Sequence, residues 1–182
     1  PAHSILQLDS KSGLARKREA ATFDLNGIAK GYGVDCMAQV MRQHGISSAL
    51  LSIDGELVAL GCQPDGSPWP VAVEAPVPGQ RSIHSIIELE CAAVATSGDY
   101  RHFVNVNGRD LAHTMDPRRG MPLLDSPASV SVVAKDCMTA DAWATVYMVL
   151  GLDAGLETAR KTGMSVLFLQ RDGNAAGSGL FA

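Results

Sequence analysis

Apolar residues recur at four-residue intervals in the segment 23–45, which predicts an amphipathic helix. The residues that share its apolar side are Ile28, Tyr32, Cys36 and Val40. Gly45 lies where the pattern stops, and glycine adopts at little cost the left-handed backbone that ends many helices. The helix is therefore expected to end there.

Short apolar runs bounded by Pro, Gly, Asn, Asp and Ser predict strands joined by turns. They cover residues 48–53, 56–60, 71–74, 85–90, 92–95, 102–106, 109–115, 128–134 and 165–170. Asp54-Gly55 and Asn107-Gly108 are hairpin signals. Residues 1–8 also alternate as a strand does.

Two more helices are expected near the C-terminus. Thr139 can cap a helix over Ala140–Leu150, with Gly151 as its stop, and a second helix covers Asp153–Thr162. Hairpins mixed with a few helices, without regular alternation, favour an α+β fold. We expect one domain over residues 1–182, with a mixed, mostly antiparallel sheet and packed helices.

Composition limits the classes of function. The chain has 182 residues, 46% hydrophobic and 19% charged, a net charge of -4 and four scattered cysteines. This charge, without a dense basic stripe, argues against nucleic acid as a partner. The cysteines form no metal-binding pattern and are expected to be buried free thiols.

The segment Asp24–Tyr32 is a glycine-bearing helix entry with Lys30 one turn inside. Free backbone N–H groups at such an entry suit phosphate oxygens, and Lys30 adds a positive charge. A structural role is the alternative, in which Asp24 caps the helix and the glycines permit close packing.

Asp141 and Thr145 are four residues apart on a predicted helix and so project from one face. Two oxygen ligands on one face suit magnesium. The alternative is that Asp141 complements the positive helix start, while Thr145 bonds its own backbone.

His113 lies at the end of a predicted strand, just before the turn at residues 116–120. A neutral imidazole is a competent general base near pH 7. A lone histidine on a strand is more often a packed or solvent-facing residue, and the chain has five histidines, so histidine itself is not diagnostic.

In their order along the chain these segments resemble the ApbE-type FAD:protein FMN transferase family. Asp24–Tyr32 is similar to the family's DLGGIAKGY stretch, Thr96–Tyr100 to its TSGDY, and His113–Pro122 to its HIIDPRTGYP. Val130–Gly151 resembles its VTVVA…ADALSTALFVLG stretch. The resemblance begins near Phe23 and implies that the chain is the larger C-terminal part of such an enzyme, without the family's N-terminal portion.

The resemblance implies magnesium-dependent transfer of FMN from FAD to a Thr or Ser hydroxyl of an acceptor protein, with release of AMP. The implied residues are Gly27, Asp141 and Thr145 for magnesium, Asp24, Lys30 and Met115 for FAD, and His113 and Asp141 for catalysis. It also implies a subunit of a respiratory-type membrane complex as acceptor, and a periplasmic location at the inner membrane.

Two other functions fit the same residues. An FAD pyrophosphatase would use water in place of the acceptor hydroxyl and yield FMN and AMP. A flavin-binding protein would use the site without catalysis. Release of AMP from FAD, measured with and without an acceptor protein, separates the three hypotheses.

Overall fold

The structure is a computed structural model that describes residues 2–77, 79–99, 103–106 and 109–182. Its helices are α1 Ala2–Ile5, α2 Asn26–Gln43, α3 Cys137–Leu150, α4 Leu152–Thr162 and the 3-10 helix η1 Gly179–Phe181. Its strands are β1 Leu6–Asp9, β2 Leu14–Lys17, β3 Ala49–Ile53, β4 Glu56–Leu60, β5 Trp69–Glu74, β6 Ile83–Leu89, β7 Ala93–Gly98, β8 Phe103–Val106, β9 Arg109–Ala112, β10 Met115–Asp116, β11 Met121–Pro122, β12 Ser129–Ala134, β13 Ser165–Leu169 and β14 Ala175–Ser178.

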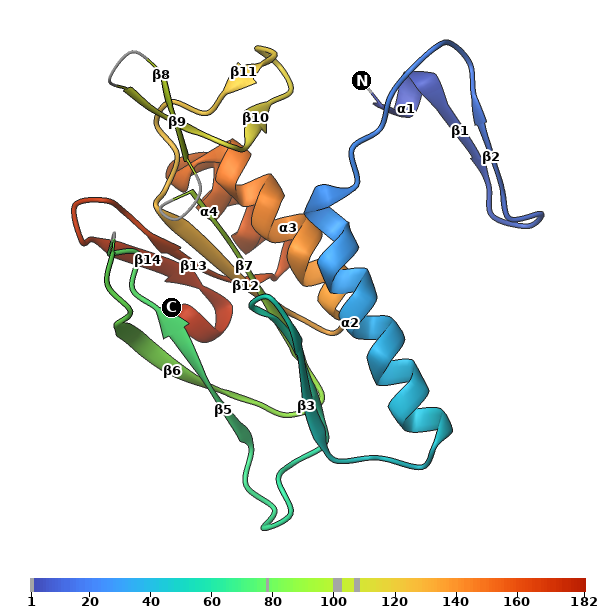
Figure 1. The fold of residues 1–182 in the computed structure, drawn as a ribbon, viewed down its shortest axis with the longest axis vertical. Helices are drawn as coiled ribbons and strands as arrows, with labels where there is room; N and C mark the ends of the chain where they lie inside the picture. The colour runs from blue at the N-terminus through green and yellow to red at the C-terminus, as the bar shows by residue number, and fades with distance from the viewer. Residues whose placement is uncertain (1, 78, 100–102, 107–108) are drawn as a thin grey trace.

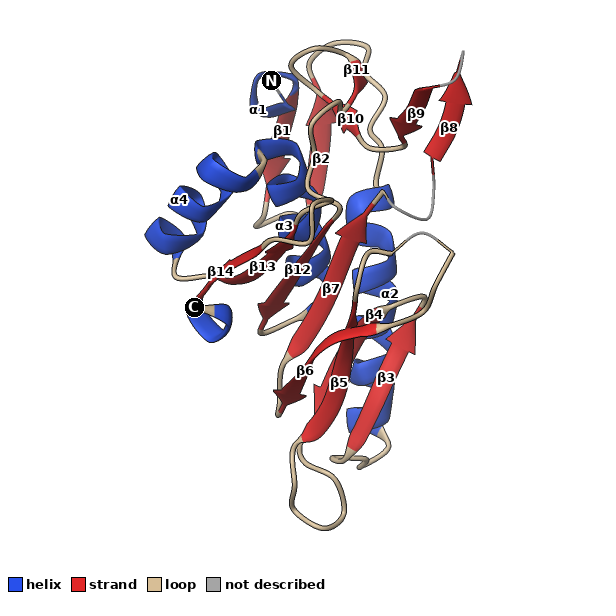
Figure 2. Ribbon diagram, turned by 90° about the vertical axis from the view of Figure 1, so that its left-hand side faces the viewer, coloured by secondary structure: helices blue, strands red, loops and turns tan. Residues whose placement is uncertain are grey.

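A six-stranded antiparallel sheet in the order β14-β13-β12-β7-β4-β3 forms the centre of the molecule. The helices α2, α3 and α4 pack on one face of this sheet, and the β5–β6 hairpin packs on the other (Figures 1 and 2). Sequence-adjacent strands pair as hairpins, and the helices are few. The predicted α+β class is confirmed.

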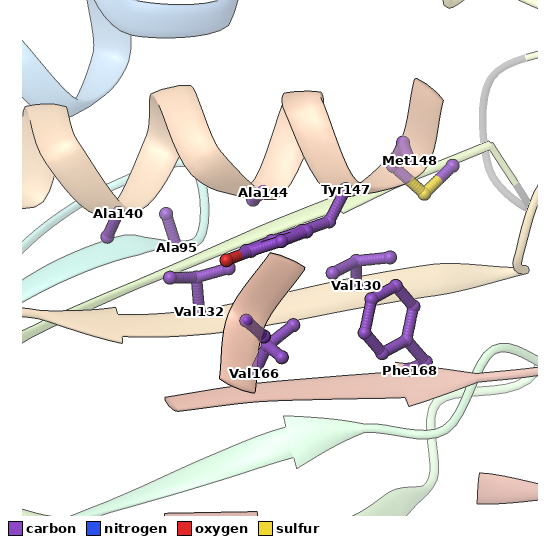
Figure 3. Packing of buried hydrophobic residues seen from close by; sticks show 10 residues of the cluster. Ala95, Val130, Val132, Ala140, Ala144, Tyr147, Met148, Val166 and Phe168 are labelled. Carbon is purple, nitrogen blue, oxygen red and sulfur yellow. The ribbon is translucent and has the colours of Figure 1, made fainter. Parts of the chain in front are cut away.

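Helix α3 is fixed to the sheet by the apolar side of its helical repeat. Its residues Ala140, Ala144, Tyr147 and Met148 pack against Val130, Val132, Val166 and Phe168 of β12 and β13 (Figure 3). Tyr147 is fully buried, and its ring centroid lies 5.8 Å from that of Phe168 in an edge-on arrangement. Close packing of large rings holds the helix in one position, so that its polar face is fixed as well.

Helix α3 begins at Cys137, earlier than the predicted start at Ala140. The cap is Asp136, whose Oδ1 accepts the Thr139 N–H at 2.8 Å, and not Thr139 itself. Asp35 of α2 adds a second cap, because its two carboxylate oxygens accept the N–H groups of Cys137 and Met138 at 2.9 Å each. Helix α2 thus provides acceptors for backbone N–H groups that have no partner within α3 at its start.

Two further expectations were wrong in part. Residues 2–5 form the short helix α1, and the predicted N-terminal strand begins only at Leu6. Figure 1 shows the β1–β2 hairpin set apart from the sheet.

All four cysteines are free, as expected, but Cys91 is exposed and only Cys137 is fully buried. The Asn107-Gly108 turn lies outside the described residues. Among the described helices, none is both long and apolar enough for a membrane span.

Candidate functional site

Helices α2 and α3 cross in close contact, and glycines on α2 make this contact possible. A Cβ added at Gly31 would lie 2.4 Å from the Cys137 carbonyl oxygen and 2.8 Å from the Asp141 Cβ. A Cβ added at Gly27 would lie 3.0 Å from Thr145 Oγ1. The crossing therefore brings the three predicted magnesium ligands, Gly27, Asp141 and Thr145, to one place.

A hydrogen bond joins the two helices at this crossing. The Gly31 N–H donates to Asp141 Oδ2 at 2.9 Å, and the bond is buried. In a regular α-helix this N–H is donated to the carbonyl of Gly27, four residues earlier. The Asp141 carboxylate therefore competes for the donor that otherwise occupies the Gly27 carbonyl.

Ser97 adds a hydroxyl that was not predicted as a site residue. It lies on β7, and its Oγ is 3.2 Å from Thr145 Oγ1. Carboxylate, carbonyl and hydroxyl oxygens are the donors that magnesium prefers. No group of three or more His, Cys, Asp or Glu side chains that could hold a metal occurs within the described ranges. A cation at the crossing would therefore depend on one carboxylate, Asp141, with neutral oxygens around it.

A cleft of about 740 Å³ opens beside the crossing, within the size range of cofactor sites. Strand β5 lines one side, and residues of β3, β4 and β7 line the other. Its polar lining residues are Lys30, Ser52, Asp54, Glu74, Arg81, Thr96, Ser97 and His113. The predicted residues Lys30 and His113 therefore face one space.

Lys30 contacts two acidic side chains on the hairpin between β3 and β4. Its Nζ lies 2.8 Å from Glu56 Oε1 and 3.8 Å from Asp54 Oδ2. Burial opposes the charged form of Lys30, but the hydrogen bond and negative charge of Glu56 outweigh it and raise the pKa of Lys30. Glu56 is only 2% exposed, and burial raises the pKa of its carboxyl. The sequence indicated only a turn at Asp54-Gly55 and gave no sign of this partner.

Asp24 and Met115, the other predicted FAD ligands, do not belong to the described lining of the cleft. Asp24 is exposed, and its Oδ1 accepts the Asn26 N–H at 2.8 Å at the entry to α2. The alternative that Asp24 caps the helix is met only in part, because the residue at the cap position of α2 is Leu25, without a side-chain cap bond. Met115 lies on β10 and is exposed. Their role in binding FAD stays a prediction.

The turn that follows His113 is held by hydrogen bonds to Asp116. Asp116 accepts hydrogen bonds from the Arg118 backbone N–H at 2.8 Å and from its side-chain Nε at 3.0 Å. The Arg118 side chain lowers the pKa of Asp116 through these contacts, so its carboxylate stays charged. Arg118 Nη2 also donates to the Val149 carbonyl of α3 at 3.4 Å. This turn therefore ties the His113 segment to the end of α3.

The end of β7 is anchored by the buried carboxylate of Asp99. Asp99 accepts a hydrogen bond from Ser126 Oγ at 2.6 Å, and its other oxygen lies 2.6 Å from Arg171 Nη2. It follows Ser97 and Gly98, which line the cleft. The polar contacts of Asp99 fix the strand end that carries Ser97 to the crossing.

The α+β fold of this chain is similar to that of flavin transferases of known structure. The flavinyl transferase ApbE of Pseudomonas stutzeri, in its apo form, superposes with a TM-score of 0.81 at 37% identity, over 96% of this chain and 54% of that one. The apbe protein of Thermotoga maritima gives a TM-score of 0.87 at 28% identity, over 98% of this chain and 58% of that one.

Sequence comparison leads to the same family. The model of the ApbE family matches residues 2–168, and the chain belongs to that family. Relatives named FAD:protein FMN transferase include one from Vibrio cholerae, 42% identical over 80% of this chain and 44% of the relative. The relative from Haemophilus influenzae is 38% identical over 90% of this chain and 48% of its own length. The chain thus spans about half the length of these curated relatives.

Proposed function

We propose that this protein transfers FMN from FAD to a Thr or Ser hydroxyl of an acceptor protein, in a magnesium-dependent reaction that releases AMP. The observation that carries the proposal is the α2–α3 crossing. There Asp141 contacts Gly31 and Thr145 contacts Gly27, one helical turn earlier on α2, beside a cleft lined by Lys30 and His113. Family membership supports the choice of flavin transfer among the reactions that such a site allows.

The charges around the crossing support a requirement for a cation. Asp54, Glu56 and Asp141 bring three carboxylates near the single ammonium group of Lys30, whose pKa all three raise. The pyrophosphate of FAD is an anion, and it would meet a site that is already acidic. Attraction of the FAD pyrophosphate therefore requires added positive charge at the crossing.

Magnesium would be held by Asp141, Thr145 and the Gly27 carbonyl. When bound, it would supply positive charge that neutralises the phosphate oxygens and stabilises the negative charge that develops on them in the transition state. The Asp141 carboxylate is kept in place by the Gly31 N–H, and Thr145 by Ser97. These contacts orient the oxygens before a substrate binds.

The chain's own residues then have distinct parts in the transfer. Lys30 donates to phosphate oxygens of FAD, and His113 takes the proton from the acceptor hydroxyl. The hydroxyl oxygen forms a bond to the FMN phosphorus, and the bond from that phosphorus to the bridging oxygen breaks, so that AMP leaves. Orientation of these groups, rather than covalent chemistry by the protein, is what phosphoryl transfer requires.

Calorimetry on the full-length protein tests the first step. FAD is expected to bind in the presence of Mg²⁺ and to bind at least about ten-fold more weakly with EDTA, because the acidic crossing repels the pyrophosphate. Equal affinity in both buffers would overturn the magnesium requirement. AMP release that needs no acceptor would assign FAD hydrolysis instead, and binding without AMP release would assign a flavin-binding protein.

His113→Ala is expected to slow transfer by roughly 10²- to 10⁴-fold and to leave FAD affinity within about two-fold of wild type. The reason is that the substitution removes the proton acceptor but leaves the groups at the crossing untouched. Single-turnover transfer and FAD titration measure the two quantities. His44→Ala, at an exposed histidine that follows α2, is the matched control. Unchanged turnover in folded His113→Ala would assign deprotonation to another group.

The acceptor and the location are proposed from family membership alone. We propose a subunit of a respiratory-type membrane complex as acceptor, and the periplasm, at the inner membrane, as location. Covalent flavin fluorescence in denaturing gels of membrane fractions tests the acceptor. Fractionation of cells that express the tagged full-length protein tests the location, and recovery only from the cytoplasm would contradict it.

A further inference from the structure

Glu56 is a buried carboxylate next to the site that the proposed reaction does not use. It is the first residue of β4 and is 2% exposed. One oxygen, Oε1, lies 2.8 Å from Lys30 Nζ. The other, Oε2, is buried and has no hydrogen-bond partner in the described part of the protein.

The fold gains little from a carboxylate at this position. The next residues on the same face of β4, Val58 and Leu60, belong to an apolar cluster with α2. An unpartnered buried acceptor destabilises the folded state, and apolar replacements of buried ion pairs often match or exceed the stability of the pair. A residue that breaks the local apolar pattern without such a gain is a mark of function.

Lys30 lies between Glu56 and the cleft, which indicates a role for Glu56. The Lys30 side chain is 40% exposed and lines the cleft, whereas Glu56 lies behind it. An ammonium group has three N–H donors. Glu56 takes one, while Asp54 at 3.8 Å is too far for a hydrogen bond. The remaining donors are available to a ligand in the cleft.

We propose that Glu56 is a positioning residue for FAD, which acts by anchoring the Lys30 ammonium at the wall of the cleft nearest the crossing. Lysine has a long flexible stem, and holding its head in one place reduces the entropy lost when a phosphate binds. Because Glu56 is buried, its electrostatic attraction for Lys30 is stronger than that of an exposed carboxylate. The inference rests on the proposed function, because it takes FAD as the ligand.

A double-mutant cycle on the full-length protein tests this coupling. The variants are Glu56→Gln, Lys30→Met and the double substitution, with Glu88→Gln on the exposed side of β6 as matched control. Gln keeps the size of Glu56 but removes its charge. The measurements are FAD affinity by fluorescence titration with Mg²⁺, KM and kcat for AMP release with an acceptor protein, and the thermal unfolding midpoint.

Glu56→Gln is expected to raise Kd and KM for FAD about ten-fold, with kcat within about two-fold and no loss of thermal stability. Lys30→Met is expected to raise Kd by about ten- to a hundred-fold. In the Lys30→Met background, Glu56→Gln should change Kd by less than about two-fold, because its route of action is already gone.

Two results would overturn the proposal. One is unchanged FAD affinity in folded Glu56→Gln, whether or not its unfolding midpoint falls. The other is a full ten-fold effect of Glu56→Gln on Kd that persists without Lys30. If Glu56→Gln fails to fold, Glu56→Asp replaces it. Asp keeps the charge on a shorter stem, so the same loss of affinity is expected and unchanged affinity overturns the proposal. Absence of FAD binding by the wild-type protein would instead defeat the proposed function itself.

Discussion

Asp141→Asn is expected to lower FMN transfer by about a thousand-fold or more while the protein stays folded. Asp141 is the carboxylate among the three proposed magnesium ligands, so its charge is the principal attraction for a cation there. Asparagine keeps the shape of the side chain and an oxygen that can accept the Gly31 N–H. The substitution therefore removes the charge with little change in packing. Transfer rate, Mg²⁺ dependence and unfolding midpoint are the measurements.

Two companion variants make the Asp141 result specific. Asp153→Asn removes the same charge from an exposed residue in the first turn of α4 and should leave transfer unchanged. Thr145→Val removes a neutral ligand oxygen and should lower the affinity for Mg²⁺ by about ten-fold. This effect is smaller than the one expected for the loss of Asp141. If Asp141→Asn unfolds the protein while the folded fraction retains full activity, the carboxylate serves only to join the helices.

Gly31→Ala is expected to destabilise the protein by about 1–3 kcal/mol and to abolish Mg²⁺-dependent FAD binding. The added methyl would lie 2.4 Å from the Cys137 carbonyl oxygen, which belongs to the backbone of α3. Backbone atoms cannot rotate aside, so the two helices must separate and carry Asp141 away from Gly27. A decrease of roughly 2–10 °C in the unfolding midpoint is expected.

Gly33→Ala is the matched control on the same helix. Its added methyl would meet only the Ile53 Cδ1 atom, at 3.0 Å, and that atom is the end of a flexible side chain. Alanine in a helix is more favourable than glycine by up to about 1 kcal/mol, so this variant should be neutral or more stable. If Gly31→Ala is equally stable and binds FAD, the close crossing does not matter for the site.

Local pattern was enough to predict the elements that carry the site. Four-residue spacing identified α2 as a helix but predicted the wrong side of it as buried. Tyr32 and Val40 are exposed, and the buried residues of α2 are Gly31, Val34 and Ala38. The positions of Asp141 and Thr145 on one face of α3 follow from helical geometry alone. The start of α3 was placed too late because Asp136 and the distant Asp35 share its capping. A cap supplied by another helix leaves no local signal in the sequence.

Local sequence pattern could not predict which side chains contact the site residues. Glu56 begins a strand, and its pairing with Lys30 depends on how the β3–β4 hairpin packs against α2. Ser97 lies in a segment that resembles the family, yet only the crossing shows its contact with Thr145. Such contacts arise between segments that tertiary packing brings together, which periodicity does not encode.

The Gly31 hydrogen bond has a consequence for how the molecule opens. Its donor and acceptor are 110 residues apart in sequence, so the bond exists only when two distant parts of the chain are assembled. Amide hydrogens inside a helix normally exchange with solvent when that helix frays or unwinds. The Gly31 amide also requires α2 and α3 to part. Its exchange rate is therefore a direct measure of how often the helix pair opens.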